Sequence, residues 1–140
     1  MIFSMLIPKH FLVVGIVAAL GIALGIASTT ASVSAQGAVA ATMVPGASTL
    51  VGAAGSKAFS PNPINVKVGG TVTWTNKDTQ AHTVVSGTGS TDPNKGKVFD
   101  SGLTTLIQPG KSFSHTFTAA GTIPYFCQIH PSMVGKIIVT

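Results

Sequence analysis

The chain has 140 residues, with 8 lysines and arginines against 3 acidic residues, a net charge of +5 and a single cysteine. This length allows one domain, and one thiol excludes an internal disulfide. The basic residues are lysines scattered along the chain, without arginine forks or an aromatic stacking platform. We therefore expect no nucleic-acid partner and assign the lysines to a solvated surface with mild steering capacity.

The first 35 residues differ in composition from the rest of the chain. Lys9 and His10 precede residues 11–27, which are apolar and uncharged, and small residues follow at 31–35. This order predicts an export signal that is removed by cleavage. A retained membrane anchor stays open as the alternative, because the apolar run is close to the shortest that spans a bilayer. We expect an exported protein, in the periplasm or pseudoperiplasm or on the outer face of the cytoplasmic membrane, with membrane contact only through an uncleaved leader.

Residues 36–56 are dominated by Ala, Gly, Ser, Thr and Val and carry neither charge nor aromatic side chain. This composition predicts a flexible linker. An added edge strand around residues 48–51 is the alternative. The folded domain is then expected at residues 57–140.

From residue 64 onward, apolar residues alternate with polar ones, which is the period of half-buried strands. Residues 64–68 and 72–74 are expected to form a hairpin around Gly69 and Gly70. Further strands are predicted at 112–118, 122–127 and 134–139, and residues 86–97 are expected to form an exposed connection. Because turn residues recur and no helical period is present, we predict an all-β fold, an antiparallel Greek-key β-sandwich.

Pro124 stands inside the strand predicted at 122–127. Because proline has no backbone N–H to donate, this position must be an edge, a bulge or an amide that faces outward. The sequence leaves these three open.

A thiolate, an imidazole and a thioether follow one another at intervals of three residues, in Cys127, His130 and Met133. Sulfur ligands select reduced copper, imidazole suits both oxidation states, and two histidines, one cysteine and a weak axial methionine are typical of electron-transfer copper. The spacing therefore predicts a metal site that needs a second histidine from elsewhere in the chain.

His82 is the best candidate for that histidine, because it follows a polar loop and precedes a predicted strand. The competitor is His115, whose parity with Phe113 and Phe117 turns it toward the core. We therefore predict His82 as the second imidazole ligand.

Residues 57–140 resemble the cupredoxins of the plastocyanin and amicyanin kind, over 64–76, 78–84, 110–117 and 121–139. The Cys-x-x-His-x-x-Met spacing is more similar to amicyanin, since plastocyanin has a longer loop. The resemblance implies one type 1 copper ion with His82, Cys127 and His130 as strong ligands and Met133 as the weak axial one. It also implies that His130 presents its ring edge at an apolar surface, where electrons enter.

This chain departs from the family pattern at two positions that flank the ligands. Relatives commonly carry Asn after the first histidine and Ser or Thr after the cysteine, and these side chains brace the two ligand loops. Thr83 and Gln128 stand there instead. Contacts of this kind tune a metal centre, so the departure bears on its properties.

The expected function is a monomeric electron carrier that cycles between Cu(II) and Cu(I) and serves redox protein partners docking around His130. It is not expected to be an enzyme, because no coordination position is left open for a substrate. An extracytoplasmic copper carrier or buffer is the alternative, although after the leader only Met43 and His115 add further ligand types. An immunoglobulin-like binding module is a third possibility, since Tyr125 mimics its tyrosine corner, but its second cysteine is absent.

Overall fold

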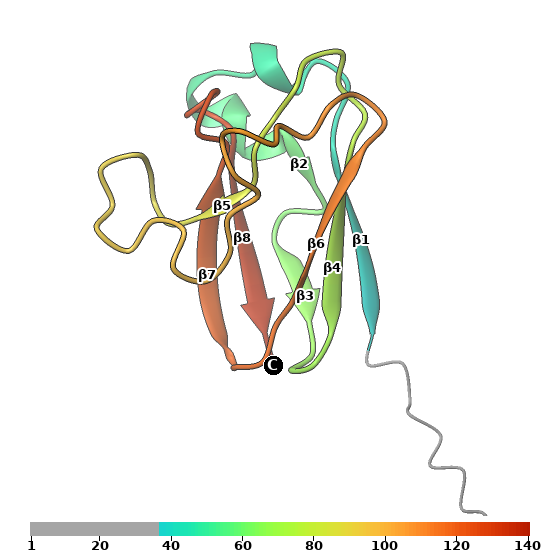
Figure 1. Cartoon of the computed structure of the whole chain (residues 1–140), viewed down its shortest axis with the longest axis vertical. Coiled ribbons are helices and arrows are strands. Elements are labelled where there is room, and N and C mark those ends of the chain that lie inside the picture. Colours follow the sequence, from blue (N-terminus) through green and yellow to red (C-terminus); the bar gives the residue numbers. More distant parts are fainter. Residues whose placement is uncertain (1–36) are drawn as a thin grey trace, which may run out of the picture. The chain divides into compact units, whose positions relative to one another are not determined.

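The computed structural model describes residues 37–140, which form two four-stranded sheets packed face to face (Figure 1). One sheet has the order β2-β1-β4-β6 and the other β3-β8-β7-β5. The strands are β1 (Ala38–Met43), β2 (Phe59–Ser60), β3 (Ile64–Val66), β4 (Thr71–Asn76), β5 (Val85–Ser86), β6 (Ser112–Thr116), β7 (Gly121–Phe126) and β8 (Val134–Val139). Two 3-10 helices, η1 (Ala47–Thr49) and η2 (Gly52–Lys57), join β1 to β2. The predicted all-β sandwich is confirmed.

The core between the sheets is aromatic. Trp74 and Tyr125 are almost wholly buried, and their ring centroids lie 5.6 Å apart in an edge-on arrangement. Phe59 packs on Tyr125 at 4.8 Å, and Phe99 packs on Trp74 at 5.4 Å. Burying such large rings stabilises the sandwich, at about 25 cal/mol per Å² of apolar surface removed from water.

Two of the strand pairings are parallel, within a sandwich that was predicted as antiparallel. β1 runs parallel to β4 along its whole length, and β3 runs parallel to β8. The other pairings are antiparallel, including the predicted last pair, β7 with β8. Parallel neighbours arise because the chain changes sheets between them, so that sequence neighbours are not always partners in a sheet.

The predicted hairpin at Gly69 and Gly70 is wrong. β3 and β4 lie in different sheets, and the turn between them is a corner that carries the chain across the sandwich. Gly69 adopts a φ of 84° and donates its N–H to Phe117, which lies beyond β6. The alternation identified which side chains face the core, but alternation is the same for a hairpin and for a corner between two packed sheets.

The predicted flexible linker is also wrong, and so is the domain start at residue 57. β1 lies between β2 and β4, and its register with β4 runs from Ala38 to Met43. Ala41 and Met43 are buried, as is Ala47 of η1. The edge strand considered at residues 48–51 does not form, since η1 occupies residues 47–49 and residues 50 and 51 belong to no strand. Small side chains let β1 lie close against the core. The same low-complexity composition is typical of a linker, so it did not predict a strand.

The leader predicted at residues 1–35 lies outside the described residues. Among residues 37–140, no helix is long and apolar enough to span a membrane.

Pro124 pairs in register with Lys136 of β8 and turns its backbone toward the β5 side of β7. β5 ends at Ser86, and there Gly87 donates its N–H to the carbonyl oxygen of Pro124 at 2.8 Å. The missing N–H of the proline therefore faces the place where the short edge strand stops, which is where a strand tolerates proline.

The loops gather at the two ends of the sandwich. The connection between β7 and β8 lies at the same end as η1 and η2, whereas the C-terminus lies at the opposite end (Figure 1). Residues of the β5–β6 connection project from the side of the sandwich as the predicted exposed loop. Three of the predicted ligands, in the loop 127–133, therefore lie at the end of the sandwich that carries η1 and η2.

Candidate metal centre

The connection from Cys127 to Met133 is a tight loop closed by its own backbone. Cys127 donates its N–H to the carbonyl of Met133 at 3.0 Å, and Met133 donates to the carbonyl of His130 at 2.9 Å. Pro131 fixes one φ within the loop. Three predicted ligands are thus held on one short segment, with little conformational freedom left to lose when a metal binds.

His82 is fixed by backbone hydrogen bonds on one side and by its ring on the other. Its N–H and C=O both pair with Ile107 in an isolated bridge. The loop before His82 is held in place by buried Asn76, whose side-chain amide donates to the carbonyl oxygens of Gln80 at 2.7 Å and Ile107 at 2.9 Å. The ring Nε2 contacts a carboxylate oxygen of Asp78 at 2.9 Å, which leaves Nδ1 to face the 127–133 loop.

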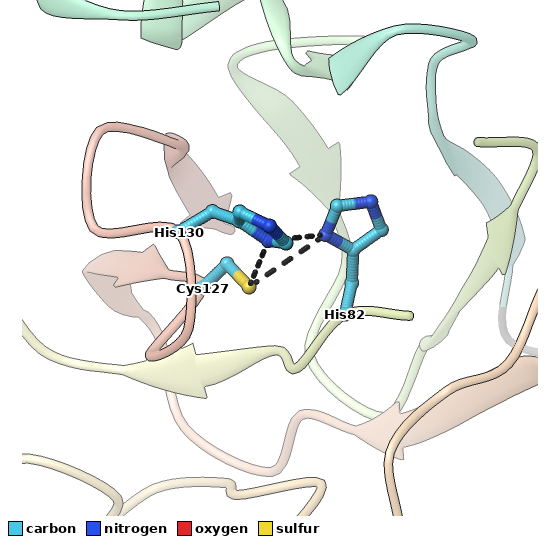
Figure 2. Close-up of side chains that lie close together, drawn as sticks. All are labelled: His82, Cys127 and His130. Carbon is cyan, nitrogen blue, oxygen red and sulfur yellow. Dashed lines mark hydrogen bonds between the residues drawn. The ribbon is translucent and has the colours of Figure 1, made fainter. Parts of the chain in front are cut away.

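Three donor atoms converge at this end of the sandwich, as Figure 2 shows. Sγ of Cys127 lies 3.7 Å from Nδ1 of His82 and 3.8 Å from Nδ1 of His130, and the two nitrogens are 3.1 Å apart. A point equidistant from the three atoms lies about 2.1 Å from each, close to the roughly 2.0–2.3 Å at which first-row metals such as zinc bind imidazole and thiolate. The triangle therefore fits one metal ion without rearrangement.

The sulfur of Cys127 is buried and accepts hydrogen bonds from the residue after His82. The backbone N–H of Thr83 donates to Sγ at 3.3 Å, and its hydroxyl lies 3.7 Å from Sγ. Burial alone would raise the pKa of the Cys127 thiol, but hydrogen bonds from His82, Thr83 and His130 lower it to about 6. The thiolate, which is the form that binds metals, is therefore the ordinary state at neutral pH.

The brace between the two ligand loops is present, although its residue types differ from those common in the family. The hydroxyl oxygen of Thr83 accepts the backbone N–H of Gln128 at 2.8 Å, immediately after the cysteine. One threonine thus holds the loop that carries His82 against the loop that carries Cys127. The brace needs only a backbone N–H from position 128, so glutamine is tolerated there.

The three converging residues differ in exposure. His82 and Cys127 are wholly buried, whereas His130 is partly exposed. Two apolar side chains near His130 are exposed: Ile129, which precedes it in the loop, is 40% exposed, and Val51 is 69% exposed. Val51 follows Leu50, whose carbonyl accepts the hydroxyl of Ser132 of the loop at 2.9 Å.

The fourth predicted ligand, Met133, is wholly buried at the end of the same loop, directly before β8. The competitor His115 lies elsewhere, on β6, where its ring packs against Phe99 at 5.3 Å and Phe117 at 4.8 Å. Burial lowers the pKa of His115, as expected for a neutral histidine against the core. The structure thus brings His82 together with Cys127 and His130 and leaves His115 out.

Asp78 is the residue at this site that sequence reasoning missed. In the sequence alone, it is only one of three acidic residues. Its spacing of four residues before His82 was the available signal, but that spacing predicts a contact only on a helix, and this segment is a bend without helical structure.

Comparisons with known proteins agree with this geometry. The family described as copper binding proteins of the plastocyanin/azurin family matches residues 47–140, which begin within η1 rather than at residue 57. Amicyanin of Paracoccus denitrificans is 34% identical over 126 residues, covering 89% of this chain and 88% of its own length. Plastocyanin of Tetradesmus obliquus is 34% identical over 87 residues, covering 61% of this chain and 60% of its own.

Solved structures show the same relationship. A purple cupredoxin from Nitrosopumilus maritimus superimposes with a TM-score of 0.61 at 31% identity, covering 73% of this chain and 99% of that one. A variant of amicyanin in the Cu(I) form gives a TM-score of 0.53 at 26% identity, covering 74% and 82%. Matching fold, matching family sequence and a converging cysteine and two histidines lead to one conclusion: the chain belongs to the plastocyanin/azurin family of copper-binding proteins.

Proposed function

We propose that this protein is a mononuclear type 1 copper protein that carries single electrons between redox partners. The observation that carries this proposal is the triangle of one thiolate sulfur and two imidazole nitrogens. His82 and Cys127 are buried, and His130 is the member of the triangle that is partly exposed to solvent. Bound copper supplies a centre that accepts and releases one electron as Cu(II) and Cu(I). The chain keeps the three donors fixed by backbone and side-chain hydrogen bonds, so little rearrangement accompanies a change of charge.

Addition of Cu(II) to the purified protein tests this function. We expect an intense visible absorption that a reductant bleaches and an oxidant restores over many cycles. A copper carrier or buffer would instead bind Cu(I) exchangeably and show no such reversible band. A protein that stays colourless with one equivalent of Cu(II) would contradict the electron-transfer function.

We assign Met133 as the fourth, weak axial ligand, because it is wholly buried at the end of the ligand loop and its backbone is hydrogen-bonded to that of both Cys127 and His130. We expect Met133→Gln to retain copper and lower the reduction potential by about 60–120 mV. This corresponds to a ten- to hundredfold increase in the affinity for Cu(II) relative to that for Cu(I), since amide oxygen is a harder ligand than thioether. Voltammetry of the loaded protein measures the shift.

Met43→Gln is the matched control for this change. Met43 is equally buried but lies in β1 within the core, so its replacement should lower the melting temperature without shifting the potential. Equal potentials for the Met133 variant and the wild type would remove Met133 from the ligand set.

We further propose that redox partners dock on the apolar surface around His130, formed by Val51, Ile129 and Pro131. The protein itself is a monomer in this proposal. Electron self-exchange, the transfer of an electron between two copies that meet transiently, uses the same surface. We expect Ile129→Lys to slow self-exchange at least about tenfold with an unchanged potential, because a charge in the contact opposes close approach of the two centres. NMR line broadening in mixtures of reduced and oxidised protein gives this rate.

Val68→Lys controls for the added charge. Val68 has nearly the same exposure, 39% against 40% for Ile129, and donates its N–H to Thr140, at the opposite end of the sandwich. The Val68→Lys variant should have a self-exchange rate close to that of the wild type. Equal slowing by both variants would assign the effect to net charge and not to the docking surface.

We infer that the protein works outside the cytoplasm, with residues 1–35 as its export signal. The support is the apolar run 11–27 followed by small residues. Determination of the N-terminus of the native protein after cell fractionation tests this. A start shortly after residue 35 in the exported fraction is expected, an intact N-terminus in the membrane fraction would indicate an anchor, and recovery from the cytosol would contradict export.

A further inference from the structure

Asp78 is a buried carboxylate, 4% exposed, that receives hydrogen bonds from two separate parts of the chain. Its Oδ2 accepts from the ring Nε2 of His82 at 2.9 Å and from the backbone N–H of Ser48 at 2.9 Å. Its Oδ1 accepts from the backbone N–H of Gly46 at 3.0 Å and of Thr79 at 2.7 Å. One side chain therefore joins the segment at η1 to the ring of a histidine at the metal centre.

These contacts keep the carboxyl group ionised despite its burial. Burial alone would raise the pKa of Asp78, but the hydrogen bonds from Ser48, His82 and Thr79 hold it well below its usual range. Among residues 37–140, His82 is the only basic side chain that contacts it, and no lysine of that range pairs with it. The carboxylate therefore interacts with the imidazole and with backbone N–H groups.

The contact also determines which nitrogen of His82 carries a proton. A carboxylate at Nε2 requires N–H at that atom, so Nδ1 carries the lone pair in the neutral form of the ring, which is the form that binds a metal. That Nδ1 is the atom that faces Sγ of Cys127 and the ring of His130 (Figure 2). Carboxylates that accept from a metal-binding histidine orient the ring and make it a stronger electron donor.

We propose that Asp78 is a positioning residue of the copper centre, holding Nδ1 of His82 toward the metal and lowering the reduction potential. This inference rests on the proposed copper function. It also gives the segment 44–50 a role, because the two backbone N–H groups of Gly46 and Ser48 hold the carboxylate in place. A negative charge behind a ligand stabilises Cu(II) more than Cu(I), which is why the potential is lowered.

Asp78→Asn removes the charge with almost no change of shape. We expect a ten- to hundredfold weaker affinity for Cu(II), the loss typical of partners that support a metal ligand. Where Cu(I) affinity is unchanged, this raises the reduction potential by about 59 mV for each tenfold, the value for a one-electron couple. Competition titrations with Cu(II) and Cu(I) chelators and voltammetry measure these quantities on the full chain.

Asp92→Asn is the matched control. Asp92 also accepts backbone N–H groups, from Thr88 and Asn94 at 2.8 Å, but it lies on the projecting loop and contacts no metal ligand. It should leave the potential and both copper affinities unchanged. If Asp78→Asn lowers only the melting temperature and leaves the potential, the absorption band and the Cu(II) affinity as in the wild type, its role is purely structural and the proposal is overturned.

The wild-type protein without metal provides a test that does not depend on folding of a variant or on copper. At alkaline pH, where His82 is neutral, two-dimensional ¹⁵N NMR should show its single ring proton on Nε2, slowly exchanging with water. A proton on Nδ1 would overturn the proposal even if the protein proves to be a copper electron carrier. Conversely, a protonated Nε2 in a chain that gives no coloured Cu(II) form would uphold the contact with Asp78 and contradict the proposed function.

Discussion

Replacement of Cys127 by alanine should abolish the visible absorption of the copper-loaded protein completely. The band arises from charge transfer between a thiolate and Cu(II), and Cys127 is the only thiol in the chain. Its Sγ lies within 3.8 Å of Nδ1 of both histidines, and the sulfur of Met133 is a thioether, which cannot form a thiolate in its place. Absorption and electron paramagnetic resonance spectra of wild type and variant, each with one equivalent of Cu(II), measure the loss.

Two measurements distinguish loss of the ligand from loss of the fold. Alanine at this buried position removes one atom, so we expect destabilisation of the metal-free protein by about 1–2 kcal/mol and retention of its near-ultraviolet circular dichroism. His115→Gln, which changes a histidine outside the site, should keep the full band. An intense band that persists in the Cys127 variant would remove this residue from the site.

The part of the site that sequence reasoning predicted is the part held on one short segment. Cys127 and His130 are close in sequence, so a single tight loop fixes their geometry, and their spacing is specific. The prediction of His82 required an assumption about which loops lie side by side. It could be made because a histidine directly before a strand also fits the family pattern. Asp78 could not be found in this way, because its role depends on a turn conformation and on backbone groups of a distant segment.

The missed N-terminal segment has a related cause. Three of residues 38–43 are alanine, which is depleted in strands, so local propensity gives only a weak signal for a strand there. The strand forms because β4 offers a free edge and because Ala41 and Met43 fit the core. Tertiary contact decided the structure of this segment, whereas in β4 and β8 the alternation of large apolar residues was sufficient.

The segment between β1 and β2 packs against the metal loop, and Gly55 of η2 is one point of close approach. Gly55 is buried, and a Cβ built there would overlap the backbone carbonyl of Ser132. The obstacle is backbone of the ligand loop and not the end of a flexible side chain, so either η2 or residues 127–133 must move. The backbone of Gly55 does not adopt a positive φ, so alanine is opposed by packing alone.

We therefore expect Gly55→Ala to lower the free energy of unfolding by about 1–3 kcal/mol, the usual cost of overpacking. At this domain size about 1 kcal/mol corresponds to roughly 4–8 °C in melting temperature. The displaced loop should also weaken Cu(II) binding and shift the absorption band, because His130 and Met133 lie on it. Calorimetry with and without copper and the visible spectrum measure both effects.

Gly37→Ala is the matched control, since a Cβ at Gly37 has no heavy atom within 4 Å. The same substitution there should change neither the melting temperature nor the spectrum by a measurable amount. If Gly55→Ala melts and absorbs as the wild type does, η2 is not packed against the ligand loop. If it loses stability but keeps the spectrum and the Cu(II) affinity, η2 yields while the loop stays in place. Loss of both means that the segment before residue 58 shapes the copper centre, as the contacts of Asp78 with Gly46 and Ser48 also imply.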